Sequence, residues 1–267
     1  MSSTFTCVAA IKAALSATRI STYEAATAVT TPDDPKAIAL YAWNAQVSAA
    51  MLAPLHICEV VVRNAVADAL DSVYGPNWPW VPVFRGSLPR QGGYSPRSDL
   101  DKVASQQPTT GKVIPELKFA FWEHMFTKRH DIRLWNGHIK RVFPEHPPSM
   151  TVRDLRKRIY QDLGVLRSLR NRIAHHEPIF TRNLSGELAR MVELVRMRST
   201  LVESWMVANQ QASALILQTP VFRGGARWTP SHEEIELKAY QLWVEAGSPN
   251  DTAEADWFAA RKLFGCR

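Results

Sequence analysis

The chain has 267 residues, of which 46% are hydrophobic, and carries a formal net charge of +7 with a sequence pI of about 9.5. This length is enough for one large domain or for a domain with a small appendage, and the apolar content supports a sizeable core. The basic charge balance favours an anionic partner.

The cysteines and the apolar segments exclude several classes of protein. Cys7, Cys58 and Cys266 are odd in number and far apart, so they suit neither a disulfide framework nor a CxxC metal site, and they predict a reducing compartment. No basic region precedes an apolar run at the N-terminus, and no apolar run approaches the roughly 18 residues of a membrane span. We therefore expect a soluble cytoplasmic protein without membrane contact.

The N-terminal third predicts helices. Residues 4–29 favour one or two helices, and residues 30–35 (TTPDDP) a turn. Residues 36–73 predict a pair of helices with a break at Pro54, the second ending before Gly75. On this second helix Glu59 and Arg63 are four residues apart, so they share a face and can form an ion pair.

The middle of the chain predicts a loop followed by helix. Pro, Gly and Ser dominate residues 76–112, so we expect little regular structure there. Its arginines, Arg85, Arg90 and Arg97, suit nucleic-acid contact or, as we expect, solvation of the loop. Residues 113–143 resume helical periodicity, and Phe119, Trp122 and Phe126 fall on one face, which favours core packing over base stacking. The histidines between 124 and 146 lack HxxxH or HExxH spacing, so we expect no metal site and no cofactor.

A long helix over about 151–177 is the best-defined element. Thr151 and Asp154 resemble a capping box at its start. Pro178 disfavours the helical conformation for Glu177, so we expect the helix to end near His176. Its predicted apolar stripe consists of Leu155, Ile159, Leu163, Leu166 and Ile173.

The end of this helix gathers polar residues that suit chemistry on RNA. The string LRSLRNRIAHHEPIF (166–180) holds six of them within eight positions: Arg170, Asn171, Arg172, His175, His176 and Glu177. The span from Arg153 to Arg172 has a net charge of +5, as an RNA-binding surface needs. The candidate RNA-binding cations there are Lys157, Arg158 and Arg167.

RNA is cleaved when its 2′-OH attacks the adjacent phosphorus. The reaction requires a base for the 2′-OH, an acid for the 5′-oxygen and cations for the phosphorane charge, but no metal ion. Histidine suits the proton transfers, and the arginine guanidinium can bind two phosphate oxygens at once. Arg170 and His175 are therefore chemically sufficient partners for this reaction.

The pattern Arg170-Asn171, three residues, then His175 resembles the signature of HEPN ribonucleases, and RNRIAHHEPIF is similar to the Abi-like (abortive infection) branch of that superfamily. Glu59, Arg63 and Asn64, the string from Tyr74 to Trp78, and ELKFAFW are also similar to that branch. The resemblance implies a HEPN-like bundle and a metal-independent endoribonuclease acting in phage defence or as a toxin. It makes Arg170, Asn171 and His175 catalytic, with supporting roles for His176, Glu177, Arg172, Glu59, Arg63 and Asn64.

The resemblance also implies partners, namely RNA, a second copy bound through the motif helix, and an antitoxin or other regulator. On a straight helix Arg170 and His175 lie about 140° apart. Either the helix unwinds before Pro178, or two chains combine their motifs in one site. The same residues are also compatible with a structural role, in which Arg170 pairs with Glu59, and with a non-catalytic HEPN-like module that binds RNA or protein.

The C-terminal part predicts a further long helix over 184–217, a linker over 219–230 and a small module over 231–267. The module is similar to a short bacterial helical module of unknown function, and two helices around an aromatic core would fit it. The residues that carry this likeness are Ala239, Tyr240, Leu242, Trp243, Gly247, Pro249, Trp257 and Ala260. The sequence thus predicts an all-α protein, with a HEPN-like domain over 1–218 that is elaborated at its N-terminus and a small C-terminal helical hairpin.

Overall fold

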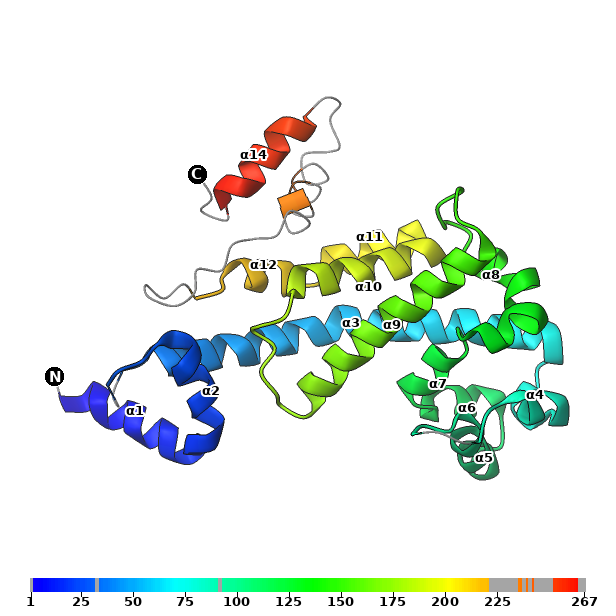
Figure 1. Cartoon of the computed structure of the whole chain (residues 1–267), viewed down its shortest axis with the longest axis horizontal. Helices are drawn as coiled ribbons and strands as arrows, with labels where there is room; N and C mark the ends of the chain where they lie inside the picture. The colour runs from blue at the N-terminus through cyan, green and yellow to red at the C-terminus, as the bar shows by residue number, and fades with distance from the viewer. Residues whose placement is uncertain are drawn as a thin grey trace. The chain divides into compact units, whose positions relative to one another are not determined.

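The computed structural model describes residues 2–31, 34–90, 93–220, 235–236, 239, 242 and 252–263. Within these ranges every regular element is a helix, so the predicted all-α class is confirmed (Figure 1). The chain forms two compact units that alternate along the sequence. Unit 1 comprises residues 1–51, 175–189 and 211–267, and unit 2 comprises 52–174 and 190–210. The predicted division into 1–218, 219–230 and 231–267 stays a prediction, because 221–234 lies outside the described residues.

Helix α3 (Lys36–Tyr74) is continuous, so the predicted break at Pro54 is wrong. Pro54 removes one backbone donor, but buried side chains before and after it, Met51 and Leu55 among them, hold the helix together. By length and composition α3 could span a membrane, contrary to our expectation. In unit 2, Leu55, Cys58 and Val62 of this helix are buried at three- and four-residue spacing, so one face of it contributes to the core of the unit.

Residues 76–112 are far more regular than predicted. They form η1 (Trp78–Trp80), α4 (Pro82–Ser87), α5 (Pro96–Gln106) and the start of α6 (Thr110–Glu116). Prolines occupy the first turns of the first three, where a missing N–H costs nothing. These prolines therefore start helices, whereas the sequence pattern indicated loops.

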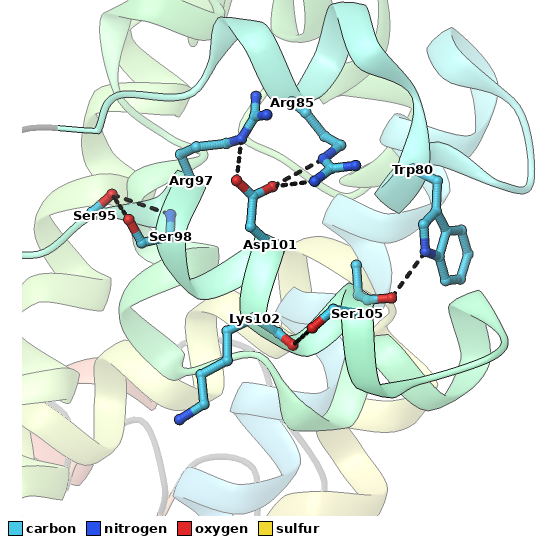
Figure 2. Close-up of polar contacts among 9 residues, drawn as sticks. Trp80, Arg85, Ser95, Arg97, Ser98, Asp101, Lys102 and Ser105 are labelled. Carbon is cyan, nitrogen blue, oxygen red and sulfur yellow. Dashed lines mark hydrogen bonds and ion pairs between the residues drawn. The ribbon is translucent and has the colours of Figure 1, made fainter.

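The arginines of this region also differ from expectation. Arg85 and Arg97 both bind the carboxylate of Asp101, at 2.7 and 2.6 Å, and Trp80 Nε1 donates to the Ala104 carbonyl (Figure 2). Arg85 thus joins α4 to α5 and Arg97 pairs within α5, while Arg90 is exposed as predicted for a solvated position.

The aromatic face predicted for 113–143 is confirmed as core. Phe119, Trp122 and Phe126 are buried, and Phe126 stacks on Trp135 with ring centroids 4.5 Å apart. After α6, the helical periodicity of this stretch corresponds to α7 (Phe119–His124), η2 (Lys128–His130), the π-helical η3 (Asp131–Trp135) and α8 (Asn136–Val142).

His130, at the junction of η2 and η3, is 5% exposed. Burial, together with the charges of Arg129 and Arg133 and of His124 when protonated, lowers its pKa from 6.5 to about 4. Between these pH values the unfolded chain binds a proton that the folded chain does not, so the free energy of unfolding falls as the pH falls.

We therefore expect acidification from pH 7 to pH 4 to remove about 3 kcal/mol of stability through this histidine. Urea unfolding at a series of pH values measures this loss. His130→Gln, which cannot take up the proton, should show a smaller fall over the same window. Equal slopes for the two proteins would contradict the assignment.

Helix α9 (Val152–Ala174) has the predicted amphipathic design. Leu155, Ile159, Leu163, Leu166 and Ile173 are all buried. At the start, Thr151 Oγ1 accepts from the Asp154 backbone N–H at 3.1 Å and donates to the Asp154 carboxylate at 2.6 Å. Thr151 is therefore the N-cap of α9, and Asp154 binds the Thr151 hydroxyl, whereas in a complete capping box it would accept from the Thr151 backbone N–H. In unit 2, α7 and α8 pack against α9.

The predicted helix over 184–217 is three helices, α10 (Leu184–Arg198), α11 (Thr200–Asn209) and α12 (Ala212–Leu217). Ser199 separates the first two, because its side chain accepts from the Val202 N–H as an N-cap.

Unit 1 contains α1 (Ser2–Leu15) and α2 (Ala17–Thr27), so residues 4–29 form two helices and not one. Tyr23 of α2 packs against Tyr41 of α3, and burial raises its pKa to about 12. A small core near the C-terminus consists of Ile235, Ala239 and Ala260, the last of which lies on α14 (Ala253–Leu263). Leu242 and Trp257 pack against it. The predicted module residues Tyr240, Trp243, Gly247 and Pro249 lie outside the described residues.

Candidate functional site

Six of the seven cations of α9 fall into two groups. Arg156 binds Asp131 at 2.9 Å, Arg158 binds Asp162 at 2.8 Å, and Arg167 binds Glu123. Arg153, Lys157 and Arg170 are exposed and form no ion pair with any described residue. The basic surface predicted from sequence is therefore partly neutralised by acids of the same unit.

The burial of Asp162 and Glu123 explains why Arg158 and Arg167 form ion pairs. Asp162 is 0% and Glu123 4% exposed, and a buried carboxylate requires a cation or several hydrogen bonds. Asp162 has two cations, since Arg190 of α10 binds its other oxygen. Of the three candidate RNA-binding residues, Lys157 is thus exposed and without an ion-pair partner in the described chain, whereas Arg158 and Arg167 hold buried acids.

Arg170 lies in the last turns of α9 with its side chain exposed, and no described residue forms a hydrogen bond with its guanidinium group. The structural role that pairs Arg170 with Glu59 is thus not realised. Asn171 and Arg172 are half-buried.

The predicted supporting residues on α3 do not form the expected pair. Glu59 makes no ion pair within the described chain, Arg63 Nε is buried without a hydrogen-bond partner, and Asn64 is exposed. No hydrogen bond or ion pair between described residues links these three to the motif on α9, so their supporting role stays a prediction.

Helix α9 ends at Ala174, two residues before the predicted end. His175 and His176 therefore lie in a turn after the helix, and His176 has the left-handed φ of 55°, which residues other than glycine seldom adopt. The straight-helix angle of about 140° does not apply to a residue beyond the helix end. This is the backbone feature that unwinding before Pro178 requires.

Within unit 1, two residues that our sequence reasoning missed hold this turn. Arg19 Nη1 donates to the His176 carbonyl at 2.6 Å. Asn44 Oδ1 accepts from the N–H groups of Ile179 and Phe180, at 2.8 and 3.1 Å. Asn44 is 6% exposed, and its position between Trp43 and Val47 on an apolar stripe was the signal that could have revealed it.

The side chains of residues 175–180 differ in their exposure to solvent. Ile179 is buried, and the Phe180 ring lies 5.2 Å from that of Tyr23. His175, His176 and Glu177 are exposed. The turn is thus anchored by its backbone and by apolar residues, while three polar side chains face solvent.

Asn44→Ala removes the acceptor of two backbone N–H groups, at least one of them buried. Leaving such a donor unsatisfied typically costs about 1–3 kcal/mol, so we expect a loss of about 2 kcal/mol in the free energy of unfolding. Amide hydrogen exchange at Ile179 and Phe180 should quicken in the same variant. Asn44→Asp keeps an oxygen acceptor and should protect both amides, and equal exchange in all three proteins would refute the anchoring role.

Other chemistry receives less support from the described residues. They contain no group of three His, Cys, Asp or Glu side chains placed to hold a metal ion. Burial and the nearby carboxylates of Glu59 and Asp162 raise the pKa of the Cys58 thiol well above its ordinary range. Cys58 therefore stays protonated and is a poor nucleophile.

Comparison with known proteins reaches only the C-terminal end of the chain. Residues 230–264 match a family described as a protein of unknown function, DUF2934. This match overlaps the predicted small module and leaves out the motif on α9. No curated protein and no solved structure matches the chain.

Proposed function

We propose that this protein is a metal-independent endoribonuclease in which Arg170 and His175 carry the chemistry. The observation that carries the proposal is the motif at the end of α9, whose Arg170 and His175 are both exposed while neighbouring arginines are bound to acids. Arg170 is part of unit 2 and His175 is part of unit 1, five positions later in the chain.

In the proposed reaction the RNA 2′-oxygen attacks the adjacent phosphorus and the bond to the 5′-oxygen breaks. His175 takes the proton of the 2′-OH, and a second acid, for which His176 is the candidate, protonates the departing 5′-oxygen. Arg170 and Asn171 stabilise the charge on the phosphorane oxygens through charge-assisted and neutral hydrogen bonds. The products are a 2′,3′-cyclic phosphate and a 5′-OH.

The biological role and the assembly are part of the same proposal. The likeness of RNRIAHHEPIF to Abi-like HEPN proteins supports phage defence or a toxin activity, with a regulator that restrains it. It also supports a homodimer through α9, on which Lys157 and Arg153 remain exposed.

The test is a cleavage assay with purified full-length protein and end-labelled total RNA and tRNA, in EDTA. We expect fragments that end in 2′,3′-cyclic phosphate. A synthetic RNA oligonucleotide that contains a mapped cleavage site should also be cut. The same oligonucleotide with 2′-O-methyl groups throughout should remain intact, because the attacking hydroxyl is blocked. RNA binding without cleavage, in the presence of cell extract as well, would favour a non-catalytic RNA-binding module.

A further inference from the structure

A strongly basic surface lies away from the motif, on the helical segment of unit 2 that comprises η3 and α8. Residues 128–141 contain five bases and one acid, for a net charge of +4. The π-helical turn of η3 runs directly into α8, since Trp135 and Asn136 both keep right-handed helical φ and ψ.

Exposure along this segment follows one repeating pattern. Leu134, Trp135, Ile139 and Val142 are buried. The exposed positions are the pairs 132–133, 136–137 and 140–141, which recur every four residues and therefore form one face. We call it the η3–α8 face, and it consists of Ile132, Arg133, Asn136, Gly137, Lys140 and Arg141.

No acid neutralises this face among the described residues. Arg133 and Lys140 form no ion pair there, and Arg141 donates only to uncharged groups, Ser72 Oγ at 2.6 Å and the Asp68 carbonyl at 3.4 Å. Asp131 is bound by Arg156 and Asp68 by Arg198, while the exposed Asp71 next to Ser72 forms no ion pair with a described residue. Glu145 is exposed but lies beyond the end of α8.

Beside this face, the preceding element η2 provides two more exposed cations without an acidic partner in the described chain. Lys128 and Arg129 of η2 are exposed, and Arg129 donates to the Ser87 carbonyl at 2.9 Å, which leaves its charge without a counter-ion in the described chain. The α9 surface is mixed, because Arg156, Arg158 and Arg167 hold carboxylates whereas Arg153, Lys157 and Arg170 form no ion pair with a described residue.

Gly137 lies in the middle of the face. A Cβ atom added there would meet nothing within 4 Å, so packing inside the protein does not require glycine. Glycine inside a helix is less stable than alanine, whereas it allows another backbone to approach closely. The face therefore has no side chain at residue 137, and its cations lie on either side of that position.

We propose that the η3–α8 face binds the sugar–phosphate backbone of RNA and holds the body of the substrate. Arg133 and Lys140 lie two helical turns apart, roughly 10 Å along the axis, so they contact different phosphates, and the Asn136 amide can hydrogen-bond to ribose or phosphate oxygens. Only Ile132 is a large apolar side chain on this face. An anionic membrane is therefore a poorer fit, because membrane-bound helices bury several such residues.

The inference rests on the proposed function for the identity of the RNA as a substrate, but binding can be measured separately from cleavage. Fluorescence anisotropy with a short labelled single-stranded RNA is measured in the full-length His175→Ala protein over a series of salt concentrations. Arg133→Gln/Lys140→Gln is compared with Lys102→Gln/Lys112→Gln, which removes two exposed charges from α5 and α6 of the same unit.

We expect the face variant to bind at least tenfold more weakly at low salt. Its slope of log K against log salt should also be shallower by about 1.4, since each phosphate contact to a single strand contributes about 0.7. The control pair should change affinity by less than about threefold. Gly137→Gln, which adds bulk but no charge and suits a helix, should weaken binding without loss of thermal stability.

Equal behaviour of the face variant and the control pair would overturn the inference. RNA binding with no salt dependence would do the same, as would binding of this face to phosphatidylserine vesicles in place of RNA. If the protein binds RNA through this face but never cleaves it, the nuclease proposal fails and this inference stands. If the protein cleaves RNA and the face variant cleaves it equally well, the nuclease proposal stands and the inference about the η3–α8 face fails.

Discussion

RNA cleavage is expected to fall by about 10²- to 10⁴-fold when His175 is replaced by alanine, because a positioned acid or base contributes about this much. Arg170→Ala should produce a loss of similar size, since the phosphorane would lose its guanidinium. Both side chains are exposed, so neither substitution disturbs the core. We therefore expect the circular dichroism spectrum and the urea midpoint of both variants to match the wild type.

Two further variants separate the roles. Arg170→Lys keeps the charge but loses the planar, two-pronged donor, so we expect it to recover only part of the activity. His176→Ala tests the second proton-transfer group, and a smaller effect than that of His175→Ala would assign it a secondary role. Initial cleavage rates with end-labelled tRNA in EDTA provide the comparison, and near-wild-type rates for both alanine variants would refute the proposed site.

The largest expected effect on stability concerns Asp162. This carboxylate is 0% exposed and is bound by Arg158 at 2.8 Å and by Arg190. Arg158→Met/Arg190→Met leaves a buried charge without a counter-ion, which typically costs about 3–5 kcal/mol. We expect the free energy of unfolding, measured with urea, to fall by that amount. Each single substitution should cost less, because one arginine remains.

The design includes a rescue and a matched control. Adding Asp162→Asn to the double variant removes the stranded charge and should restore most of the lost stability. Arg153→Met/Lys157→Met removes two exposed cations from the same helix that bind no described acid, so it should change stability by about 0.5 kcal/mol or less. A similar loss in both double variants would mean that α9 needs the charges in general and not this ion pair.

The ion pairs of α9 determine which of its cations are available to contact RNA phosphates. Net charge along the sequence counts Arg156, Arg158 and Arg167 as equal to Lys157. In the structure those arginines hold Asp131, Asp162 and Glu123, so they are poor candidates for phosphate contact. On α9, Arg153, Lys157 and Arg170 form no ion pair with a described residue, and the same is true of Arg133, Lys140 and Arg141 on the η3–α8 face.

Sequence alone determined the features that depend on neighbouring positions. The stripe from Leu155 to Ile173 and the Thr151–Asp154 cap were predictable because residues three and four apart always meet on a helix. The burial of Phe119, Trp122 and Phe126 followed from the same periodicity. The all-α class was predictable for this reason, and so was the presence of a polar cluster at the end of α9.

Only the tertiary structure decided the features that join distant segments. Asn44 binds N–H groups about 135 residues further along the chain, and Arg167 binds an acid 44 residues before it. Pro54 continues a helix and the prolines of 76–112 start helices, because packing outweighs a local preference of a few kcal/mol. The physical reason is common to all of them: burial determines which polar groups need a partner, and burial is a property of the folded chain and not of any short stretch of it.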